Sequence, residues 1–556
     1  MFKQAAIVLV ISLLTTFLVV KDKFALPFLS KEPPIVASEV REQIEIAFLD
    51  SWNDYSAHAW GYDAYGPITR KRVNMPRSGD PMGWMIIDTV DTMMLMYNSS
   101  VNHKDAFLEA ITKAEDWINS TLNYDTDAEM NIFETTIRML GGLLSAYHLS
   151  TGLSIGNPKV YLNKAIDIGD RLAMGFLNTE KGIPYSSVNL RTGQSVKNHV
   201  DEGASSTAEF TTLQLEFKYL SFVTGNASYW KLSEMVYPPL YEINNLLGSH
   251  YQGLVPIYTV PDTGRFYGEN IRMGSRGDSF YEYLSKQYLM TGEDLYYKLY
   301  RASMDGMKKN LLGRSYPNSL TFIGEKPRGL HNPLDNKMDH LVCFLGGLLA
   351  MGATNGLPIS EARNNPSWNA EKEDDWKLAQ EFTYTCYQMY VQTPSGLSPE
   401  IVVFNDNSES MKNRARQESW WLSLDGDFYI KPLDGHNLQR PETVESIMFL
   451  YQLTKDEKYR VWGKHILESF LEHTSVMDRD LNRPKYVGLV NCVEIPTLKK
   501  DDIESFWLAE TLKYLYLLFE DDVDLTKIVF NTEAHPFPVI SKQQLMERGL
   551  KTGWTL

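Results

Sequence analysis

Two kinds of helical segment alternate along this chain from Val36 onward. One kind is apolar nearly all round, as in the run ETTIRMLGGLLSAYHL that starts at Glu134. The other kind is amphipathic and more charged, as in DDWKLAQEFTYTCYQMY, which starts at Asp374. A helix that is apolar on all sides is buried, and an amphipathic helix covers it. The pattern therefore predicts a fold dominated by α-helices, in which buried and covering helices alternate.

Seven segments of each kind can be placed on the chain. Helical repeats of this spacing form either an open solenoid or a closed ring. No polar capping repeat is visible at either end, which favours helical hairpins closed into a toroid. The apolar segments begin near Asp88, Glu134, Ser206, Asp278, Asp339, Pro441 and Glu504. The amphipathic segments lie near residues 36–56, 104–117, 158–172, 228–246, 293–310, 372–392 and 458–473.

The connections between these segments contain short β-like runs, such as residues 182–186 and 254–259. We expect them to form hairpins on one face of the toroid. No Pro/Ser-rich linker interrupts residues 36–556, so we expect one domain over that range.

The N-terminal residues 4–20 carry no charge and are nearly all apolar, with Lys3 before them and Lys21 and Lys23 after them. No convincing small-residue cleavage site follows, as a secretory signal would need. The span is at the short end for a transmembrane helix and suits a thin bilayer such as that of the endoplasmic reticulum. We expect an uncleaved signal anchor in residues 1–20 and a stem over residues 21–35. The lysines on both sides leave the orientation open.

Composition narrows the class of ligand. The net charge of −16 argues against nucleic acid, whose phosphates need a basic surface. The 12 Trp, 31 Tyr and 24 Phe residues, together with abundant acids, suit a polyhydroxylated ligand, because rings stack on sugar faces and carboxylates accept hydroxyl protons.

Two further features fit an oxidising lumen. Tripeptides that accept N-glycans begin at Asn98, Asn119 and Asn226. The cysteines are Cys343, Cys386 and Cys492, and one disulfide plus one free thiol is the simplest arrangement. The spacing does not reveal which two are paired, and no metal-type cysteine spacing exists.

In a toroid the buried helices would all start on the same face, so their first-turn residues would converge on one cavity. The clearest such start is Arg440–Glu445, where Pro441 suits the first turn and the helix dipole favours an ionised Glu442. Acids also cap isolated helices, but here they recur at every predicted start. The converging residues are Asp88, Asp91, Glu134, Arg138, Glu209, Glu216, Arg276, Asp278, Glu282, Asp339, His340, Glu442, Glu445, Glu504 and Glu510, and Glu400 on a loop could join them.

Such a cavity suits two kinds of chemistry. Paired carboxyls hydrolyse glycosides, one protonating the leaving oxygen and the other activating water. Oxygen ligands also bind a hard cation. No EF-hand loop, HExxH, GxSxG or Gly-rich phosphate loop is present, and His340 by itself is more typical of a structural histidine.

A set of motifs along the chain resembles a known family. The chain is similar to the class I alpha-1,2-mannosidases of glycoside hydrolase family 47, and within them to the endoplasmic-reticulum type of fungi. The resemblance covers essentially all of residues 36–556. The motifs that carry it are HAWGYD (58–63), DTVDT (88–92), FETTIR (133–138), GSRGDS (274–279), MDHL (338–341), RPETVES (440–446) and FNTEAHP (530–536).

The resemblance implies an (α/α)7 barrel whose one end is plugged by a C-terminal β segment, here residues 528–530. It also implies a Ca²⁺ ion at the barrel floor, contacted by the hydroxyl and carbonyl of Thr532. Surrounding acids, Glu510 and Glu533 among them, would hold the waters of the metal. Periodicity and spacing alone do not single out Thr532.

The family match further implies roles for individual residues. Glu442 is expected to be the general base, Glu134 the general acid acting through a water, and Asp278 a third essential carboxylate. An inverting reaction of this kind needs the two carboxyls roughly 6.5–9.5 Å apart. Phe506 would stack under the mannose, and Arg276 would mark the type that removes one mannose, where Golgi-type relatives carry leucine. The expected substrate-binding residues are Arg138, Glu216, Arg276, Glu282, His340, Glu400, Arg440, Glu445, Phe506, Glu510 and Glu533.

By the same match Cys343 and Cys386 form the disulfide, and Cys492 is left free, with an oxidoreductase as an unproven partner. The expected activity is Ca²⁺-dependent trimming of high-mannose N-glycans by a type II membrane protein with a lumenal domain. Three alternatives stay open: a broader Golgi-type enzyme, a glycan-binding receptor of the degradation pathway on the same fold, and an (α/α)6 glucan hydrolase without Ca²⁺.

Overall fold

The computed structural model describes residues 34–556, apart from 77–78, 178, 479 and 481. The predicted anchor lies outside the described residues, as does nearly all of the stem. Within the described part, no helix is long and apolar enough to cross a membrane. Residues Ser38–Leu556 form one compact unit, which contains all the helices and strands named below except the first residue of α2.

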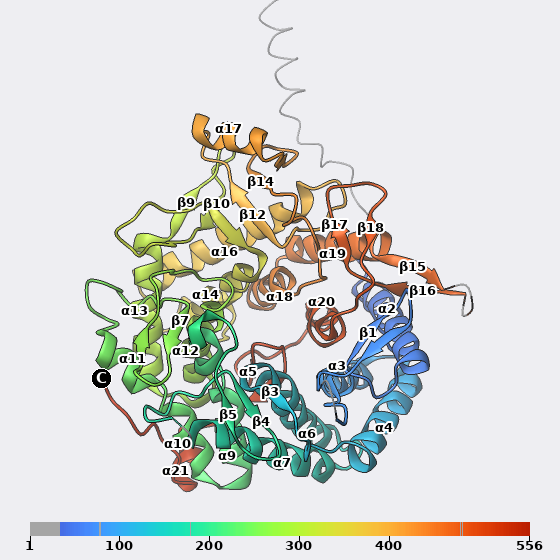
Figure 1. Ribbon diagram of the computed structural model, residues 1–556. Helices are drawn as coiled ribbons and strands as arrows, with labels where there is room; N and C mark the ends of the chain where they lie inside the picture. The colour runs from blue at the N-terminus through green and yellow to red at the C-terminus, as the bar shows by residue number, and fades with distance from the viewer. Residues whose placement is uncertain (1–33, 77–78, 178, 479, 481) are drawn as a thin grey trace, which may run out of the picture. The chain divides into compact units, whose positions relative to one another are not determined.

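The alternation of buried and covering helices is confirmed (Figure 1). The seven inner segments are α3 (Trp84–Ser99); α5 (Ile132–Glu134) with the π-helix η1 (Thr135–Leu140) and α6 (Gly141–Leu153); α8 (Thr207–Thr211) with α9 (Gln214–Thr224); α12 (Asp278–Thr291); the 3₁₀ turn η3 (His340–Phe344) with α14 (Leu345–Thr354); α18 (Glu442–Thr454); and the π-helix η4 (Trp507–Thr511) with α20 (Leu512–Leu518). The outer helices are α2 (Ala37–His58), α4 (Lys104–Ser120), α7 (Pro158–Leu177), α10 (Ala227–Glu234) with α11 (Tyr237–Asn244), α13 (Asp294–Asn310), α16 (Ala370–Val391) and α19 (Glu457–His473).

The inner helices close into a ring. Each packs on the next in the order α3, α6, α9, α12, α14, α18 and α20, and η4 packs back on α3. The first outer helix, α2, completes the closure, because Arg41 pairs with Glu520 at 2.7 Å and Trp507 donates to the Ser51 hydroxyl at 3.1 Å. The expected (α/α)7 barrel is therefore the fold.

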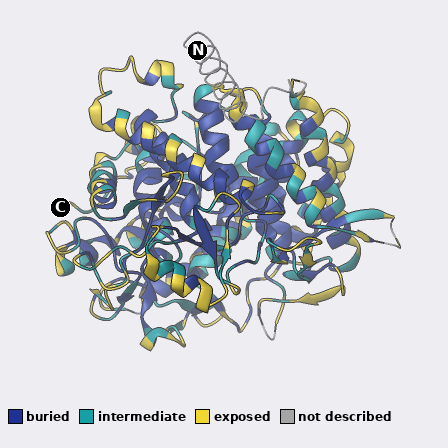
Figure 2. Ribbon diagram, turned by 90° about the horizontal axis from the view of Figure 1, so that it is seen from above, coloured by how far each residue is buried: buried dark blue, intermediate teal, exposed yellow. Residues whose placement is uncertain are grey.

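Burial follows the sequence pattern. All ten residues of α14 are buried, whereas α4 buries one stripe that includes Phe107, Ile111 and Trp117. Figure 2, coloured by burial, shows the exposed positions on the outside of the unit and the buried ones in its interior. The core is thus the inner ring together with the inward faces of the outer helices.

Short antiparallel strands occupy the connections, as expected. The pairs and sheets are β1 (Ala64–Gly66) with β2 (Lys71–Val73); β3 (Glu129–Asn131), β4 (Ser187–Asn189) and β5 (Ser195–Val196); β6 (Ser205–Ser206), β7 (Tyr258–Val260) and β8 (Arg265–Phe266); β9 (Leu312–Arg314) with β10 (Thr321–Ile323); β11 (Lys337–Asp339), β12 (Ile401–Phe404), β14 (Phe428–Ile430) and β13 (Trp421–Leu422); β15 (Ser475–Asp478) with β16 (Arg483–Tyr486); β17 (Leu489–Asn491) with β18 (Leu498–Lys499); and β19 (Ile528–Phe530) with β20 (Pro536–Pro538). Short helices η2 (Asp201–Gly203), α15 (Ile359–Ala362), α17 (Glu409–Gln417) and α21 (Lys542–Glu547) complete the described elements.

The β19–β20 hairpin is the expected plug. Its register pairs Val529 with Phe537, and both side chains are buried. β19 packs on α12 and β20 on α6, so the hairpin lies inside the ring and its turn carries residues 531–535 to the inner helices.

Three boundaries differ from the sequence prediction. The first inner helix begins at Trp84 rather than near Asp88. Gly83, the residue directly before it, takes φ +80°, a left-handed conformation that interrupts the backbone and lets the helix start there. The amphipathic segment 228–246 is two helices, since Pro238 and Pro239 suit the first turn of a new helix better than the interior of a long one. The β-like run 182–186 lies just before β4, and Pro184 within it has no N–H to pair.

Candidate active site

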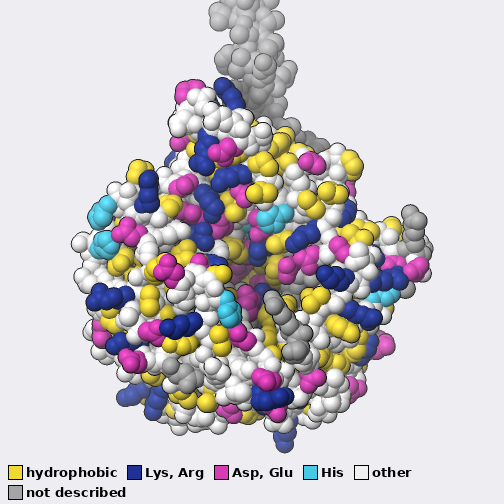
Figure 3. All heavy atoms as spheres, in the orientation of Figure 1, with side chains coloured by type: hydrophobic (Ala, Val, Ile, Leu, Met, Phe, Trp, Pro, Cys, Tyr) yellow, Lys and Arg dark blue, Asp and Glu magenta, His cyan; other side chains and the backbone are white. Residues whose placement is uncertain are grey.

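A cavity of about 360 Å³ opens where the inner segments start. Its lining comes from six of the seven inner segments and from the β19–β20 turn. Figure 3 shows acidic side chains in a hollow near the middle of this face. Of the predicted site residues, those that line the cavity are Glu134, Arg138, Arg276, Asp278, Glu282, Arg440, Glu442, Glu445, Phe506, Glu510, Thr532 and Glu533.

Glu442 is held as an ionised carboxylate. It begins α18, and its Oε2 lies 2.8 Å from Nδ1 of His340. Burial alone would raise the pKa of Glu442, but the hydrogen bond and charge of His340 and the charge of Arg440 bring it below the usual value for glutamate. The other ring nitrogen of His340 contacts the hydroxyls of Tyr390 and Thr443 at 3.0 and 2.9 Å. His340 is therefore a fixed support behind Glu442, outside the lining itself.

Asp278 is the opposite case. It begins α12 and accepts a hydrogen bond from the backbone N–H of Ser279 at 2.9 Å. Burial, with the nearby charges of Glu282 and Asp339, raises the pKa of Asp278 to about 7. The cavity thus contains one carboxyl that favours ionisation and another that holds a proton near neutral pH, the arrangement used in acid–base pairs.

Arg138 joins four side chains at one edge of the cavity. Its guanidinium donates to Glu134 at 2.9 Å, to Asp88 at 3.0 Å and to Glu533. Ser505 accepts a further hydrogen bond from it at 3.2 Å. Arg138 lies in the π-helix η1, which begins at the residue after Glu134. A π-helical turn changes the direction in which the side chains on it point, here that of Arg138.

A second layer of charges lies beneath this edge. His535 bridges Asp91 at 2.7 Å and Asp88 at 3.1 Å, and Lys513 pairs with Asp91 at 2.9 Å. Burial opposes a charged imidazole, but the two aspartates raise the pKa of His535 to about 9. Asp88 and Asp91 therefore fix the β19–β20 turn from below instead of facing the cavity, which differs from the prediction that they converge on it.

Glu282 and Thr532 form part of the floor of the cavity, and Lys286 lies buried behind them. The Thr532 hydroxyl donates to Glu282 at 2.7 Å, and Lys286 pairs with the same carboxylate. Glu216 lies below them, fully buried, and accepts hydrogen bonds from Tyr283 at 2.6 Å and from Asn531 at 2.7 Å. Burial raises the pKa of Glu216 to about 7. Glu216 supports the floor but does not line the cavity.

Phe506 has an arginine on either side. The guanidinium carbon of Arg440 lies 5.3 Å from the centre of its ring, and that of Arg138 lies 6.0 Å away. Nε of Arg440 donates to both carboxylate oxygens of Glu400, at 2.9 and 2.7 Å, and Glu400 itself is outside the lining. At the opposite side Arg276 takes φ +73° and pairs with Asp201 at 3.2 Å, stacked over Tyr258.

The floor has the donor chemistry of a hard-cation site. Glu445, Glu510, Glu533 and Thr532 all line the cavity, and every side-chain atom with which they could ligate a metal is an oxygen. Oxygen is the ligand atom that hard cations prefer. Burial raises the pKa of Glu445 and Glu533 to about 8 and that of Glu510 well above the usual value, and neighbouring carboxylates reinforce this. A divalent cation here would offset the repulsion among the acids, so the residues fit Ca²⁺. A different trio of metal-ligand type, Asp54, His58 and Asp478, lies away from this cavity.

Sequence reasoning assigned no role to several residues of the site. Lys286 follows Glu282 by one helical turn, a spacing that could have revealed it. Lys513 interrupts the apolar run of α20, which could have drawn attention to it. His535 lies in the FNTEAHP motif (530–536), but the family resemblance gave this histidine no role. Glu209 lines the cavity and was among the converging acids, but it was given no function.

The disulfide joins Cys343 to Cys386, with Cα atoms 5.8 Å apart. Cys492 is free and fully buried, and burial raises the pKa of its thiol. The folded unit therefore gives an oxidoreductase no access to Cys492. The three predicted glycan acceptors, Asn98, Asn119 and Asn226, are exposed.

Comparisons with known proteins agree with one another. The profile of glycosyl hydrolase family 47 matches residues 47–539. The endoplasmic reticulum mannosyl-oligosaccharide 1,2-alpha-mannosidase of Saccharomyces cerevisiae is 62% identical over 522 residues, covering 94% of both chains. The protein of the same name from Schizosaccharomyces pombe is 45% identical over 89% of both chains. A solved alpha-1,2-mannosidase from Trichoderma reesei superposes with a TM-score of 0.75 at 25% identity, over 90% of this chain and 99% of that one.

Proposed function

Because the chain belongs to glycosyl hydrolase family 47, we propose that it is an inverting alpha-1,2-mannosidase that trims high-mannose N-glycans in the endoplasmic reticulum. The observation that carries the proposal is the pairing in one cavity of Glu442, whose pKa is lowered, with carboxyls whose pKa values are raised. Residues 36–556 would form the catalytic domain.

Glu442 would act as the general base. Its ionised carboxylate takes a proton from a water molecule, which then attacks the anomeric carbon of the terminal mannose. The hydrogen bond from His340 keeps Glu442 ionised and fixes its orientation. Arg440, held by Glu400, keeps a positive charge next to Glu442 at this edge of the cavity.

Glu134 would deliver the proton to the leaving oxygen through a water, since its carboxylate is held by Arg138 and remains partly exposed to the cavity. Asp278, whose pKa is about 7, would be partly protonated at neutral pH and could supply a further proton within the cavity. Phe506 offers an apolar ring on which the face of the sugar can stack.

Thr532 would hold Ca²⁺, with Glu510 and Glu533 orienting the waters around the ion. When bound, the cation supplies a fixed positive charge against which the hydroxyl groups of a mannose ring are oriented. Lys286 and Arg138 already neutralise part of the acidic floor, so they keep the geometry of Glu282 and Glu533 intact as the ion exchanges.

The test is the Glu442→Gln variant incubated with a Man9 glycan. We expect loss of mannose release by at least about a thousandfold, because the variant retains shape but cannot accept the proton, with glycan binding still measurable. Full activity in this variant would overturn the assignment of the base.

The number of sugars released separates this proposal from its alternatives. At limiting enzyme the proposed type removes one mannose, a Golgi-type enzyme removes several, and a glycan-binding receptor removes none. Arg276→Leu tests which type the protein is. It removes the guanidinium group that pairs with Asp201 and leaves Glu442 in place. We expect it to trim further than the unchanged protein does.

The membrane and glycan assignments complete the proposal. Residues 1–20 would anchor the protein in the endoplasmic-reticulum membrane with the catalytic domain in the lumen. Exposure of Asn98, Asn119 and Asn226 supports their glycosylation. Resistance to alkaline extraction, together with a mobility shift after endoglycosidase treatment, tests both assignments; extraction of the intact chain by carbonate would contradict the anchor.

A further inference from the structure

The ring closes where its first outer helix meets a hairpin from its last repeat. α2 ends at His58, and the β15–β16 hairpin follows α19. Contacts across this seam include Lys485, which donates to the backbone carbonyl of Pro67 at 2.7 Å. The seam lies outside the catalytic cavity, since none of its residues line that cavity.

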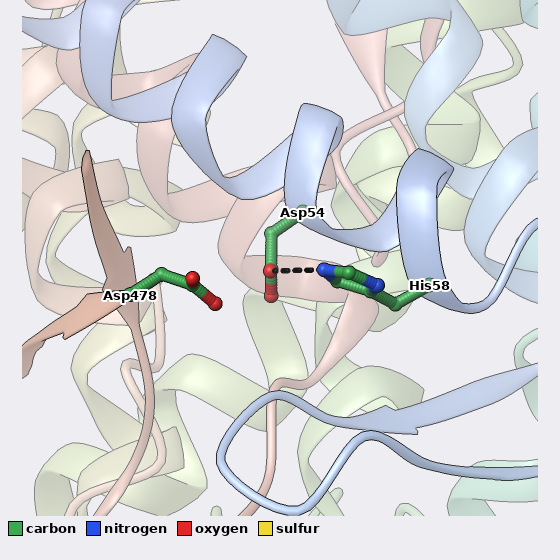
Figure 4. Close-up of side chains that lie close together, drawn as sticks. All are labelled: Asp54, His58 and Asp478. Atoms are coloured by element: carbon green, nitrogen blue, oxygen red, sulfur yellow. Dashed lines mark ion pairs between the residues drawn. The ribbon is translucent and has the colours of Figure 1, made fainter. Parts of the chain in front are cut away.

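Asp54 and His58 lie one helical turn apart on α2, and Asp478 is the last residue of β15 (Figure 4). One ligand atom from each of the three side chains lies within 4.8 Å of the other two. Figure 4 shows the carboxylate of Asp54 between the imidazole of His58 and the carboxylate of Asp478. An i, i+4 pair on a helix with a third ligand from another element is a common plan for a metal site.

The state of Asp54 points to a missing ligand. Asp54 is 3% exposed, and neither carboxylate oxygen has a hydrogen-bond partner of ordinary geometry, although the Tyr65 hydroxyl, which also lacks one, lies close enough to interact with it. The nearest imidazole nitrogen, Nε2 of His58, is 3.7 Å away and also lacks a hydrogen bond. A buried carboxylate whose oxygens make no regular hydrogen bond is costly, and a bound ion is one way in which proteins offset that cost.

The surrounding lysine and arginine pair directly with Asp478, whereas Asp54 has His58 as its ion-pair partner and feels Lys485 only at longer range. Lys485 pairs with Asp478 at 3.0 Å, and Arg70 approaches the same oxygen at 3.4 Å. Asp54 has no such partner among the described lysines and arginines. A cation placed between Asp54 and His58 would therefore meet a carboxylate that no described lysine or arginine pairs with directly, and it would share Asp478 with Lys485.

We propose that Asp54, His58 and Asp478 bind a divalent transition-metal ion of the Zn²⁺ type at the seam of the ring. The imidazole nitrogen selects such an ion over Ca²⁺, which takes oxygen ligands. Zinc ligands lie about 2.0–2.2 Å from the ion, so the three side chains would close in by roughly 1 Å. The ion would tie the first outer helix to the last repeat and stabilise the closed ring.

The test uses the full-length protein in detergent with Ca²⁺ in excess, so that the proposed catalytic site is already supplied. Zn²⁺ is titrated by calorimetry, and Co²⁺ is titrated by its visible absorption as a reporter of nitrogen and oxygen ligation. We expect one saturable Zn²⁺ per chain and a higher melting temperature. Asp54→Asn and His58→Gln should each weaken binding at least tenfold and abolish the thermal shift.

Asp480→Asn is the matched control, because Asp480 belongs to the same hairpin and is exposed. It should bind Zn²⁺ as the unchanged protein does. All variants should retain mannose release in Ca²⁺, which shows that they are folded. Absence of saturable Zn²⁺ binding, or equal affinity in the Asp54 and His58 variants, overturns the proposal.

Discussion

At the scale of single residues, the neighbours of each carboxyl group in the cavity decide whether its pKa is raised or lowered. His340 and Arg440 lower the pKa of Glu442, whereas burial next to other acids raises the pKa of Asp278. Both carboxyls begin buried helices, so the helix start alone does not decide the outcome. The direction of the pKa shift depends instead on side chains from other repeats, such as His340, which contacts Glu442.

The support by His340 leads to a prediction about pH. In His340→Phe the ring remains but its hydrogen bond to Glu442 is lost, so burial should raise the pKa of Glu442. The proposed mechanism requires an ionised Glu442, so the acid limb of kcat/KM should move to higher pH by about one unit or more. Initial rates of mannose release across the acid range measure this.

Tyr390→Phe is the control, since it removes a partner of His340 but leaves the contact with Glu442. Its acid limb should stay with that of the unchanged protein. An acid limb that does not move in His340→Phe would contradict the role given to this histidine.

His535 makes the stability of the fold depend on pH, and this stabilisation is lost as pH rises, whereas activity that needs an ionised Glu442 is lost as pH falls. Its pKa is about 9 in the folded chain and about 6.5 when unfolded, so its stabilisation is complete below about pH 6.5 and is lost as pH rises through about 9. We expect ~3 kcal/mol from this group in the free energy of unfolding. Urea denaturation at several pH values should show the decline.

The His535→Gln variant should be less stable at acid pH and should lose most of this pH dependence. The pKa of Asp91 is about 2, so Asp91 stays ionised throughout that range and does not confuse the comparison. A decline of the same size in His535→Gln would assign it to other groups.

At the scale of elements, two π-helical turns carry parts of the site. η1 follows Glu134 and contains Arg138, and η4 contains Glu510. Hydrophobic periodicity predicts a regular helix through both segments, because an insertion of one residue barely changes the apolar pattern. The sequence therefore identified these residues but could not give the directions in which they point.

The disulfide links two of the helical elements covalently. It joins η3, which supplies His340, to the outer helix α16 across 43 residues of sequence. Replacing both Cys343 and Cys386 by serine should lower the free energy of unfolding by about 2–4 kcal/mol. Urea denaturation under non-reducing conditions measures the loss.

Cys492→Ala provides the comparison, since it removes a buried thiol without breaking a cross-link. It should cost less than the double variant. Equal losses in the two proteins would mean that packing, and not the cross-link, stabilises this region.

At the scale of the whole molecule, the ring and its number of repeats were predictable from the alternation of apolar and amphipathic segments. The family motifs also gave most of the residues that line the cavity. The layers beneath were not predictable, because contacts such as Asp91 with Lys513 and His535 join residues more than 400 positions apart. No local pattern reports on such pairs, and only the closed ring brings them together.

The proposed dependence on Ca²⁺ is a property of the whole molecule, because residues from several repeats build the floor of the cavity. Removal of the ion by EDTA should abolish mannose release and lower the melting temperature, and added Ca²⁺ should restore both. Because the pKa values of Glu445 and Glu533 are about 8 without metal, Ca²⁺ affinity should fall as pH drops below about 8 and these groups bind protons. Calorimetric titration at two pH values measures this.

Mg²⁺ is the control ion, because it prefers a smaller and more regular shell of oxygens and should restore less activity. Undiminished turnover after exhaustive chelation would rule out a metal in the reaction. Retained activity with unchanged Ca²⁺ affinity at acid pH would exclude Glu445 and Glu533 from the ion's surroundings.

The β19–β20 hairpin has a consequence for how the protein is made. Its turn supplies Thr532 and Glu533, whereas Glu134 comes from the second inner segment. A polypeptide is synthesised from its N-terminus, so the earlier repeats can begin to pack before the residues of the cavity floor have been made. The catalyst therefore cannot act on any glycan, including those on its own chain, until synthesis is nearly complete.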